Sequence, residues 1–384
     1  MLSVLHCPEQ VGSHPAILSK FERKLGVSSL SVSENSNPYA VESDKNFGSM
    51  TSSMLITEIL RIKLILTTSF SDGIIHLNNG RFITPFFGEG VHPKEHNFPS
   101  YIRKLFRFYA KCLLQTEIAL FRLKGDRKAA FLTFQGSDAR ETQCFIDKYQ
   151  ENGLANDIIG RSGKTNKSIR SKKIKLSGIA DKIYSLNPDL LTVLPKGAEF
   201  LPYATEAPLN AKVMPIKQCG EFVVGHAPTH RMVKGTDCIL DVIERLKNRG
   251  YNIRLELIEN LQRVEALKKF EQIDVFVDQL IIGWFGVVSL EVMALGKPVI
   301  CFVKGKGLKF VPKKMLAELP ILNADETSLE NKIIEVYNMN VEQKTNQANK
   351  GIEFLKTWYD PQKIADKVVT DYKAVLSGRT QNCI

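Results

Sequence analysis

The feature that most constrains the fold is a regular alternation of strand and helix patterns in the second half of the chain. Short apolar runs alternate there with segments whose apolar residues recur at helical spacing, as at Ile239, Val242, Ile243 and Leu246. Strands that are separated by helices pair in parallel, because each return needs a crossover. This half is therefore predicted to be a doubly wound α/β domain. The expected strands are Phe222–His226, Ile253–Ile258, Val275–Val277 and Val299–Val303, and the expected helices are Asp237–Arg249, Leu261–Phe270 and Ser289–Leu295.

The first half shows the same pattern more weakly. A chain of 384 residues is too long for one core and suits two domains. We expect a first Rossmann-like lobe over 1–206 and a second over 207–360, with the segment 361–384 packing back on the first. The stretch from about 31 to 54 is rich in Ser and Asn and predicts a loop. The strands expected in the first lobe are Leu2–His6, Gly73–Leu77, Ala129–Phe134 and Lys182–Leu186, and the helices expected in the tail are Ser328–Tyr337, Val341–Trp358 and Gln362–Val375.

Composition excludes several classes of protein. Apolar residues make up 43% of the chain and charged residues 24%, which excludes a largely disordered chain. The seven cysteines are scattered without a C-x-x-C pair or clustered histidines, so we expect reduced thiols and no metal site. The N-terminus has no basic region followed by an apolar run, and charges interrupt the apolar stretch Met54–Phe70. We therefore expect a cytoplasmic protein with no secretory signal and no transmembrane helix.

One segment has the residues of a phosphate site. The run His226–Asp237 joins a predicted strand to a predicted helix and contains Arg231 and Lys234. Free backbone N–H groups at a helix start favour an anion, and two cations within one turn add to that preference. The alternative is that both charges are solvated loop residues.

A second segment, Asp278–Val299, has the features of a loop that approaches a ligand. Gly283 and Gly286 allow close backbone approach, and Glu291 lies in the first turns of the following helix. A carboxylate there is suited to accept hydrogen bonds from the diol of a ribose. The alternative role for Glu291 is a favourable charge at the helix N-terminus.

Together these segments resemble a known family. The run from Gly225 to Val303, with K-G-T-D and D-Q-x-x-x-G-W-F-G-x-x-x-L-E-x-M-A-x-G-K-P-V, resembles the nucleotide-sugar domain of GT-B glycosyltransferases. The resemblance is to the large retaining family that includes sucrose- and glycogen-synthase-like enzymes. It covers about 80 residues and implies two Rossmann-like domains that face a cleft.

The resemblance also implies roles for single residues. Arg231 and Lys234 would bind the donor diphosphate and act in catalysis, and Glu291 would bind the ribose. The loop Gly283–Gly286, with Trp284 and Phe285, would touch the sugar. One departure is that Gly283 stands where the family has the first glutamate of its E-x7-E motif, a loss for which Asp278 or Gln279 could compensate.

The first lobe offers weaker candidates, which the same resemblance places beside the acceptor. The run Thr133–Arg140 resembles a strand end of the family in which Gln135 replaces the usual histidine. Asp138 and Arg140 are its polar candidates for the cleft, Asp138 also as a catalytic group, and the alternative is a capped helix start. His76 ends another strand, where a packed core histidine is the alternative. Gly12 and Ser13 resemble the glycine loop that approaches the donor phosphates.

The basic excess points to anionic partners. The chain has a formal charge of +11, and two stretches concentrate it. In Tyr101–Lys124, an apolar stripe flanked by basic residues suits either an anionic membrane surface or a core helix. Arg161–Lys175 is basic without an acidic residue, so it suits a membrane surface or a solvated face. Nucleic acid is not expected as a partner, because the chain shows no zinc finger and no RNA-recognition signature.

The function expected is transfer of a sugar from a nucleoside-diphosphate sugar to a glycan or lipid-linked hydroxyl acceptor, as in polysaccharide biosynthesis. Retention of anomeric configuration is implied by the resemblance alone. No cofactor or metal is expected, since Arg231 and Lys234 would neutralise the leaving diphosphate. The alternatives are a nucleotide-sugar 2-epimerase of the same architecture and a catalytically silent nucleotide-sugar-binding subunit. Peripheral attachment to the inner face of the membrane is a further expectation.

Overall fold

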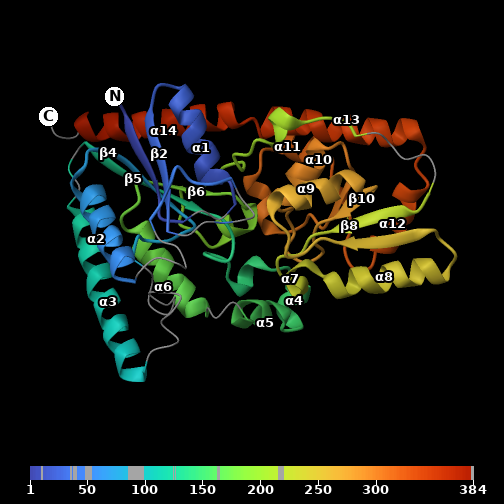
Figure 1. Cartoon of the computed structure of the whole chain (residues 1–384), viewed down its shortest axis with the longest axis horizontal. Coiled ribbons are helices and arrows are strands. Elements are labelled where there is room, and N and C mark those ends of the chain that lie inside the picture. The colour runs from blue at the N-terminus through green and yellow to red at the C-terminus, as the bar shows by residue number, and fades with distance from the viewer. Residues whose placement is uncertain are drawn as a thin grey trace.

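A computed structural model of the chain shows two lobes, each built on a parallel sheet (Figure 1). The first sheet has the order β3-β2-β1-β4-β5-β6-β7 and the second β12-β11-β10-β8-β9. Every strand pair in both sheets is parallel, which confirms the predicted α/β fold with two doubly wound sheets. The structure describes residues 1–9, 12–34, 37, 41–47, 54–84, 99–123, 125, 127–161, 165–214 and 220–381.

The first lobe centres on β5, whose residues are all buried, as a strand between helical layers requires. The predicted loop from about 31 to 54 was wrong in part, because the stretch contains the end of β2 and all of β3. The buried side of β2 consists of serines, which are satisfied by polar partners: Asp44 accepts from the hydroxyl of Ser31, and Glu22 from that of Ser29. The strands are β1 Ser3–Cys7, β2 Ser28–Ser33, β3 Lys45–Asn46, β4 Gly73–Asn78, β5 Lys128–Phe134, β6 Lys182–Ser185 and β7 Glu199–Phe200.

The helices of the first lobe differ in how they are buried. α1 packs into the lobe with most of its residues buried, whereas α2 and α3 lie side by side at its outer edge (Figure 1). Among the described residues, no helix is long and apolar enough to cross a membrane. The elements are α1 His14–Lys24, α2 Met54–Phe70, α3 Ser100–Arg122, η2 Thr142–Cys144, α4 Asp147–Glu151, α5 Leu154–Arg161, α6 Asn166–Ser177 and η3 Pro188–Thr192.

The two predicted basic stretches are placed differently. α3 exposes Leu105 and Cys112 of its apolar stripe and turns the rest partly inward. On α6, Lys172 and Lys173 are buried, and Lys173 pairs with Glu141, so this run is only in part a solvated face. Residues 162–164 of the second stretch, and Lys124 of the first, lie outside the described residues.

The second lobe follows its prediction closely, because its apolar periodicity is strong. The four predicted strands and three predicted helices are present within about two residues of their predicted bounds. The elements are η4 Ala207–Asn210, β8 Phe222–His226, α7 Arg231–Lys234, α8 Thr236–Asn248, β9 Ile253–Leu257, α9 Arg263–Gln272, β10 Val275–Val277, α10 Val287–Ala294, β11 Val299–Cys301, η5 Lys306–Phe310, α11 Lys313–Ala317, β12 Leu322–Asn323, α12 Leu329–Tyr337 and α13 Val341–Trp358.

The chain crosses between the lobes more than once. The segment that holds α4 and α5 reaches across to the second lobe, where Tyr149 joins its core and donates a 2.9 Å hydrogen bond to the carbonyl of Leu280. After α13, helix α14 (Pro361–Gln381) returns along the top of the molecule and packs on α1 and β5 (Figure 1). Ala365 and Val368 on α14 are buried in the same cluster as Phe131 of β5.

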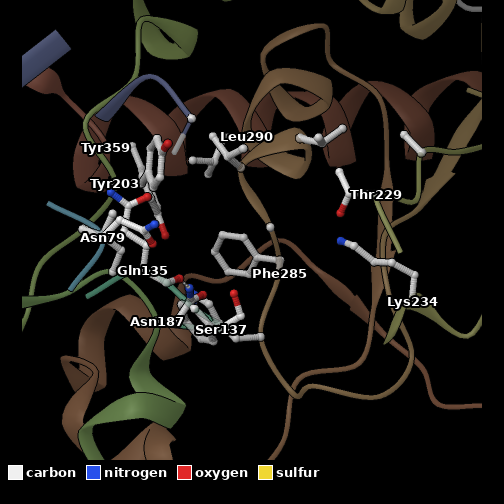
Figure 2. Close-up of a pocket in the computed structure, with 18 residues that line it drawn as sticks. Asn79, Gln135, Ser137, Asn187, Tyr203, Thr229, Lys234, Phe285, Leu290 and Tyr359 are labelled. Carbon is white, nitrogen blue, oxygen red and sulfur yellow. Dashed lines mark hydrogen bonds between the residues drawn. The ribbon is translucent and has the colours of Figure 1, made fainter. Parts of the chain in front are cut away.

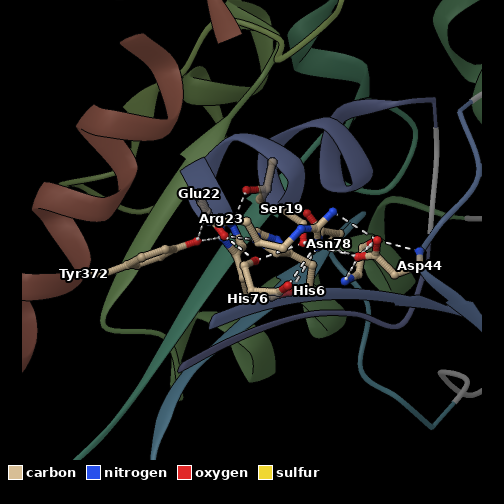
Figure 3. A network of polar contacts seen from close by, with 11 residues as sticks. His6, Ser19, Glu22, Arg23, Asp44, His76, Asn78 and Tyr372 are labelled. Carbon is tan, nitrogen blue, oxygen red and sulfur yellow. Dashed lines mark hydrogen bonds and ion pairs between the residues drawn. The ribbon is translucent and has the colours of Figure 1, made fainter. Parts of the chain in front are cut away.

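A buried polar network fixes α14 to the first lobe (Figure 3). The carboxylate of Glu22 on α1 accepts hydrogen bonds from His6, Ser29 and the Tyr372 hydroxyl of α14. The same hydroxyl is bonded to Nδ1 of His76 at 2.6 Å. All of these side chains are buried, so the hydrogen bonds of the network replace contacts with water.

Candidate functional site

A cleft lies between the lobes, where parallel strands of both sheets end. A cavity of about 340 Å³, the cleft cavity, is lined by loops that follow β1, β4 and β5 on one side and by α7 and the loop before α10 on the other. In Figure 2, Asn79 and Gln135 face Lys234 and Thr229 across this space, with Phe285 between them. Crevices at the carboxyl ends of strands are the usual ligand sites of such sheets.

Gln135 is the most unusual side chain in the cleft. It follows β5, is only 8% exposed, and lines the cavity, yet neither its amide oxygen nor its amide nitrogen has a hydrogen-bond partner among the described residues. Its backbone is firmly held, because its N–H donates to Asp138 and its carbonyl accepts from Asn187. A buried amide without a partner is costly, so this side chain is suited to a polar ligand.

The other acceptor-side candidates turn away from the cleft cavity. Asp138 is buried and accepts hydrogen bonds from the backbone of Gln135 and Gly136, so it holds the loop that carries Gln135. Arg140 pairs with Asp189 at 2.7 Å. His76 lies in the buried network beneath α14, between Tyr372 and Thr133. His76 is thus packed in the core, which was the alternative raised for it. The alternative for Asp138 and Arg140, a capped helix start, is not found, because residues 137–139 form a turn and no helix starts there.

The loop before α1 approaches the cleft through its glycine. Gly12 has a φ of 65°, and a Cβ there would lie 1.8 Å from the hydroxyl of Tyr203, so only glycine fits. The same hydroxyl accepts a 3.3 Å hydrogen bond from the backbone N–H of His14, at the start of α1. Gly12 and Tyr203 line the cavity, whereas the hydroxyl of Ser13 accepts from the backbone of Val41. The sequence did not predict a role for Tyr203, because this residue lies in a linker without a motif.

Lys234 is the cation of the cleft cavity. It ends α7 and pairs with Asp278, which is 1% exposed and also accepts hydrogen bonds from the Gly286 backbone and the Ser289 hydroxyl. Burial acts to raise the pKa of Asp278, but Lys234 and these hydrogen bonds outweigh it and hold the pKa below its ordinary value. The carboxylate thus stays charged and fixes the lysine at the edge of the cavity.

A second cavity of about 280 Å³, the outer cavity, adjoins the first and shares Ala227, Thr229 and Val288 with it. It contains two ion pairs. Arg231 is half-exposed and makes two hydrogen bonds to Glu259, of 2.9 and 2.6 Å. Glu291 accepts a 2.8 Å hydrogen bond from Arg263, which opposes the burial that raises the pKa of Glu291. Glu259 and Arg263 were not predicted, since single charges in a loop and a helix start give no distinctive signal.

The glycine loop is split between two cavities. Trp284, Phe285 and Gly286 line the cleft cavity, with the two rings stacked at 4.5 Å. Gly283 instead lines a third cavity of about 370 Å³ between the lobes. Its φ is 90°, and a Cβ there would lie 2.1 Å from the carbonyl oxygen of Lys304, so the backbone leaves no room for a glutamate. The glutamate that stands at this position in the motif this segment resembles would not fit here.

Gln279, the residue after Asp278, holds this loop from inside. Its amide nitrogen donates to the carbonyl of Trp284, and its amide oxygen accepts from the backbone of Ile281 and Ile282. Asp278 and Gln279 thus fix the loop at both ends. Within the described part of the chain, no group of His, Cys, Asp and Glu side chains is arranged to hold a metal ion.

Comparison with known proteins gives the fold. No family model and no curated protein matches the sequence. Among solved structures, the chain is similar to sucrose-phosphate synthase from Thermosynechococcus elongatus, with a TM-score of 0.59 and 12% identity over 98% of this chain and 100% of that one. It is also similar to an α-glucosyltransferase solved with UDP-glucose and DNA containing an abasic site, with a TM-score of 0.57 and 10% identity over 97% and 99%. It is similar as well to a glycosyltransferase from Rickettsia africae, with a TM-score of 0.54 and 11% identity over 98% of both chains. These likenesses show that the chain has the GT-B architecture.

Proposed function

We propose that this protein transfers a sugar from a nucleoside-diphosphate sugar to a hydroxyl acceptor, as a hexosyltransferase that retains the anomeric configuration. The observation that carries the proposal is the pair of adjoining cavities, with Lys234 in the inner one and Arg231 in the outer. An elongated ligand with its negative charge near the middle fits this arrangement. The retaining outcome rests on the resemblance of the sequence to a retaining family.

In this proposal the outer cavity holds the nucleoside. Glu291 is its buried carboxylate and accepts hydrogen bonds from the ribose hydroxyls, while Arg263 shares that carboxylate. Arg231 lies at the mouth and exchanges part of its contact with Glu259 for the diphosphate. The apolar floor, which includes Ile258 and Phe270, suits the face of a base.

The diphosphate then lies at the junction of the two cavities, beside Lys234. Breaking the bond between the sugar and the diphosphate leaves negative charge on a phosphate oxygen, and a fixed cation stabilises that charge most in the transition state. Asp278 fixes the lysine before the reaction begins. Lys234 and Arg231 supply the neutralising charge, and the proposal requires no metal or other cofactor.

The sugar occupies the cleft cavity between Phe285 and Gln135. The Gln135 amide offers one donor group and one acceptor to a sugar or acceptor hydroxyl, which satisfies the two atoms that lack protein partners. The acceptor, a glycan or lipid-linked hydroxyl, enters from the side of the first lobe.

The first test is a thermal-shift panel of UDP-, GDP-, ADP- and TDP-sugars. A ligand at a hundred times its Kd adds about 2.7 kcal/mol of stability, so one base class should stand out. Turnover of that donor is then measured with and without acceptors. Acceptor-dependent release of the nucleoside diphosphate supports the proposal. Interconversion of the sugar without acceptor indicates the 2-epimerase, and binding without turnover indicates a silent subunit.

Gln135→Ala refines this test. This variant should lower the rate of sugar transfer while leaving the affinity for the nucleoside diphosphate unchanged, because Gln135 lines the cleft cavity and not the outer cavity. Gln143→Ala, an exposed glutamine in the third cavity, is the matched control and should change neither quantity. Equal losses of affinity and transfer would place Gln135 at the nucleotide instead of at the sugar.

A further inference from the structure

The outer edge of the first lobe carries an unusual surface on α2 and α3. Half of the exposed large apolar side chains in the described part of the chain belong to these two helices, including Phe70 at 76% exposure and Phe108 at 68%. On each helix they recur at helical spacing and form one stripe. Contiguous apolar surface of this kind marks an interaction site. We call it the α2–α3 face; its apolar members are Leu55, Ile56, Ile59, Ile62, Leu66 and Phe70 of α2, with Tyr101, Leu105 and Phe108 of α3.

The opposite face of α2 is anchored, which fixes the apolar stripe on the outside. Arg61 is completely buried there and pairs with Glu58 on its own helix and with Glu34 after β2. Glu58 also accepts a 3.1 Å hydrogen bond from the hydroxyl of Tyr109, on α3. Turning α2 about its axis would expose this buried ion pair and break it, a change that is strongly unfavourable. The fold of the first lobe therefore keeps the apolar stripe of α2 exposed.

The charges on these helices are sorted by sign. The two acidic residues of α2 and α3 turn inward: Glu58 belongs to the Arg61 cluster, and Glu117 is buried and accepts from the backbone of Ile83 and Thr84. The exposed charged residues of both helices are all basic. They are Lys63, Lys104, Arg107, Lys111 and Arg122.

We propose that the α2–α3 face docks on an anionic phospholipid bilayer. Apolar side chains would enter the acyl boundary while flanking lysines and arginines contact lipid phosphates. A second copy of the chain fits less well, because pairing two such faces brings like charges together. Nucleic acid would satisfy the cations but leave the apolar stripe in water. The inference rests on the proposed function in one respect, since it places the acceptor at a membrane surface.

The inner side of α2, opposite the apolar stripe, is linked to the cleft through ion pairs and a hydrogen bond. Glu34, which pairs with Arg61, also pairs with Arg81, and Arg81 pairs with Glu9 at 3.1 Å. Glu9 in turn accepts a 3.0 Å hydrogen bond from Asn79, which lines the cleft cavity. The helices that touch the bilayer and the loop that faces the acceptor thus belong to one rigid ion-pair network. The proposed surface differs from the one predicted from sequence, since it uses α2 in place of the basic run on α6.

The experiment is sedimentation with vesicles of phosphatidylcholine alone, or of phosphatidylcholine mixed equally with phosphatidylglycerol. We expect binding to the anionic vesicles only, with release as salt rises. Lys104→Glu with Arg107→Glu should weaken partition at least about 25-fold, since each basic residue near the surface contributes roughly fivefold. Leu105→Ser with Phe108→Ser should weaken binding to the anionic vesicles at low salt, because these side chains supply part of the apolar contact. The matched controls are Lys313→Glu with Lys314→Glu and Val264→Ser with Phe310→Ser, on exposed parts of the second lobe, and both should bind as the parent does.

Three results would overturn the inference. One is equal partition onto neutral and anionic vesicles, or onto neither. Another is self-association of the parent that disappears in Leu105→Ser with Phe108→Ser, which would make the face an interface between copies. The third is that a short DNA duplex binds the parent and displaces it from vesicles. Donor affinity, measured by calorimetry without vesicles, should be the same in all these variants, so failure of the docking proposal is separable from failure of the proposed transferase activity.

Discussion

The two lobes bury polar groups for different purposes. In the second lobe, the buried polar side chains Asp278, Gln279 and Ser289 all shape the loop that faces the cleft. In the first lobe, the largest buried polar network, around Glu22 and His76, lies beneath α14 and away from the cleft cavity (Figure 3). These three residues of the second lobe thus lie at the cleft, whereas the network around Glu22 in the first lobe lies where distant segments of the chain are joined. Stability and ligand binding should therefore respond to different changes in the two lobes.

We expect the largest difference between the two lobes in their stability at acid pH. Burial lowers the pKa of His14 to about 3 and that of His226 to about 4, and burial also holds the pKa of His76 well below its ordinary value. Because the folded pKa values are lowered, the unfolded chain binds protons first, so stability is complete above about pH 6.5 and falls as the pH decreases toward the folded values. At about pH 5, His14 and His226 each cost about 2 kcal/mol. His76 adds to the cost in the first lobe, and protonation of Glu117, whose pKa burial raises to about 7, offsets part of it.

The measurement is an acid titration followed by circular dichroism and by tryptophan emission. Both tryptophans lie in the second lobe, but Trp284 also contacts Phe200 of the first lobe. The Trp284→Phe variant leaves Trp358, which donates a hydrogen bond to Glu318, as the reporter of the second lobe. Loss of ellipticity should precede the change in emission. If emission changes first, the first lobe is not the more acid-sensitive.

Removing Glu22 tests the network of the first lobe directly. Glu22→Ala leaves His6, Ser29 and Tyr372 without their shared partner and should lower the free energy of unfolding by about 3–5 kcal/mol. Urea unfolding measures this loss, with the exposed Glu353→Ala as control. Nucleoside diphosphate affinity of the folded variant should stay unchanged, and a parallel loss of affinity would show that the network does reach the site.

Lys234 tests the second lobe, where one residue is expected to serve both stability and chemistry. Lys234→Ala should lower turnover about a hundredfold or more, and by more than it lowers donor affinity, because the leaving charge is largest in the transition state. It also leaves Asp278 buried without its cation. The double variant Lys234→Ala with Asp278→Asn should recover stability but not turnover. Recovery of both would reduce Lys234 to a structural partner.

Arg231→Ala tests the other cation that we propose binds the diphosphate. It too should lower turnover more than donor affinity, but with little effect on stability, since its pair with Glu259 is at the surface. Steady-state kinetics and urea unfolding measure the two quantities. Equal losses of turnover and affinity would make Arg231 a binding residue only.

Glu291 should give the smallest effect. Glu291→Ala should weaken nucleoside diphosphate binding by about 1–3 kcal/mol in calorimetry, as expected for a lost hydrogen bond to a charged group, while the fold stays intact. The exposed Glu353→Ala is again the control. Unchanged affinity in Glu291→Ala would remove this residue from the site.

The two lobes also differ in how much their sequence predicts. In the second lobe, apolar periodicity and a dense motif placed the strands, the helices and the loop around Phe285 in advance. In the first lobe β2 was missed, because all but one of its buried side chains are serines, and the partner of Ser31, Asp44, lies 13 residues away. Apolar periodicity predicts only strands that bury apolar side chains. It cannot predict a strand whose buried side chains are polar and hydrogen-bonded to residues far away in the chain.

The same limit applies to the candidate site. Sequence placed Gln135, Lys234 and Gly12 at strand ends, and these residues do line the cleft cavity. It could not tell that Asp138 and His76 turn inward, because the direction of a side chain at a strand end depends on partners far along the chain. Tyr203 and Arg263 were not predicted as site residues for the same reason, because each makes its contact only in the folded molecule.

The return of α14 to the first lobe has a consequence for how the molecule is made. Tyr372 and His76 touch although 296 residues separate them in the chain. On the ribosome, the first sheet is complete long before the helix that covers it has been translated. We infer that the first lobe spends the synthesis of the whole second lobe with part of its core uncovered. Folding of this protein is then not sequential by lobe: the lobe that is translated first is the one that finishes last.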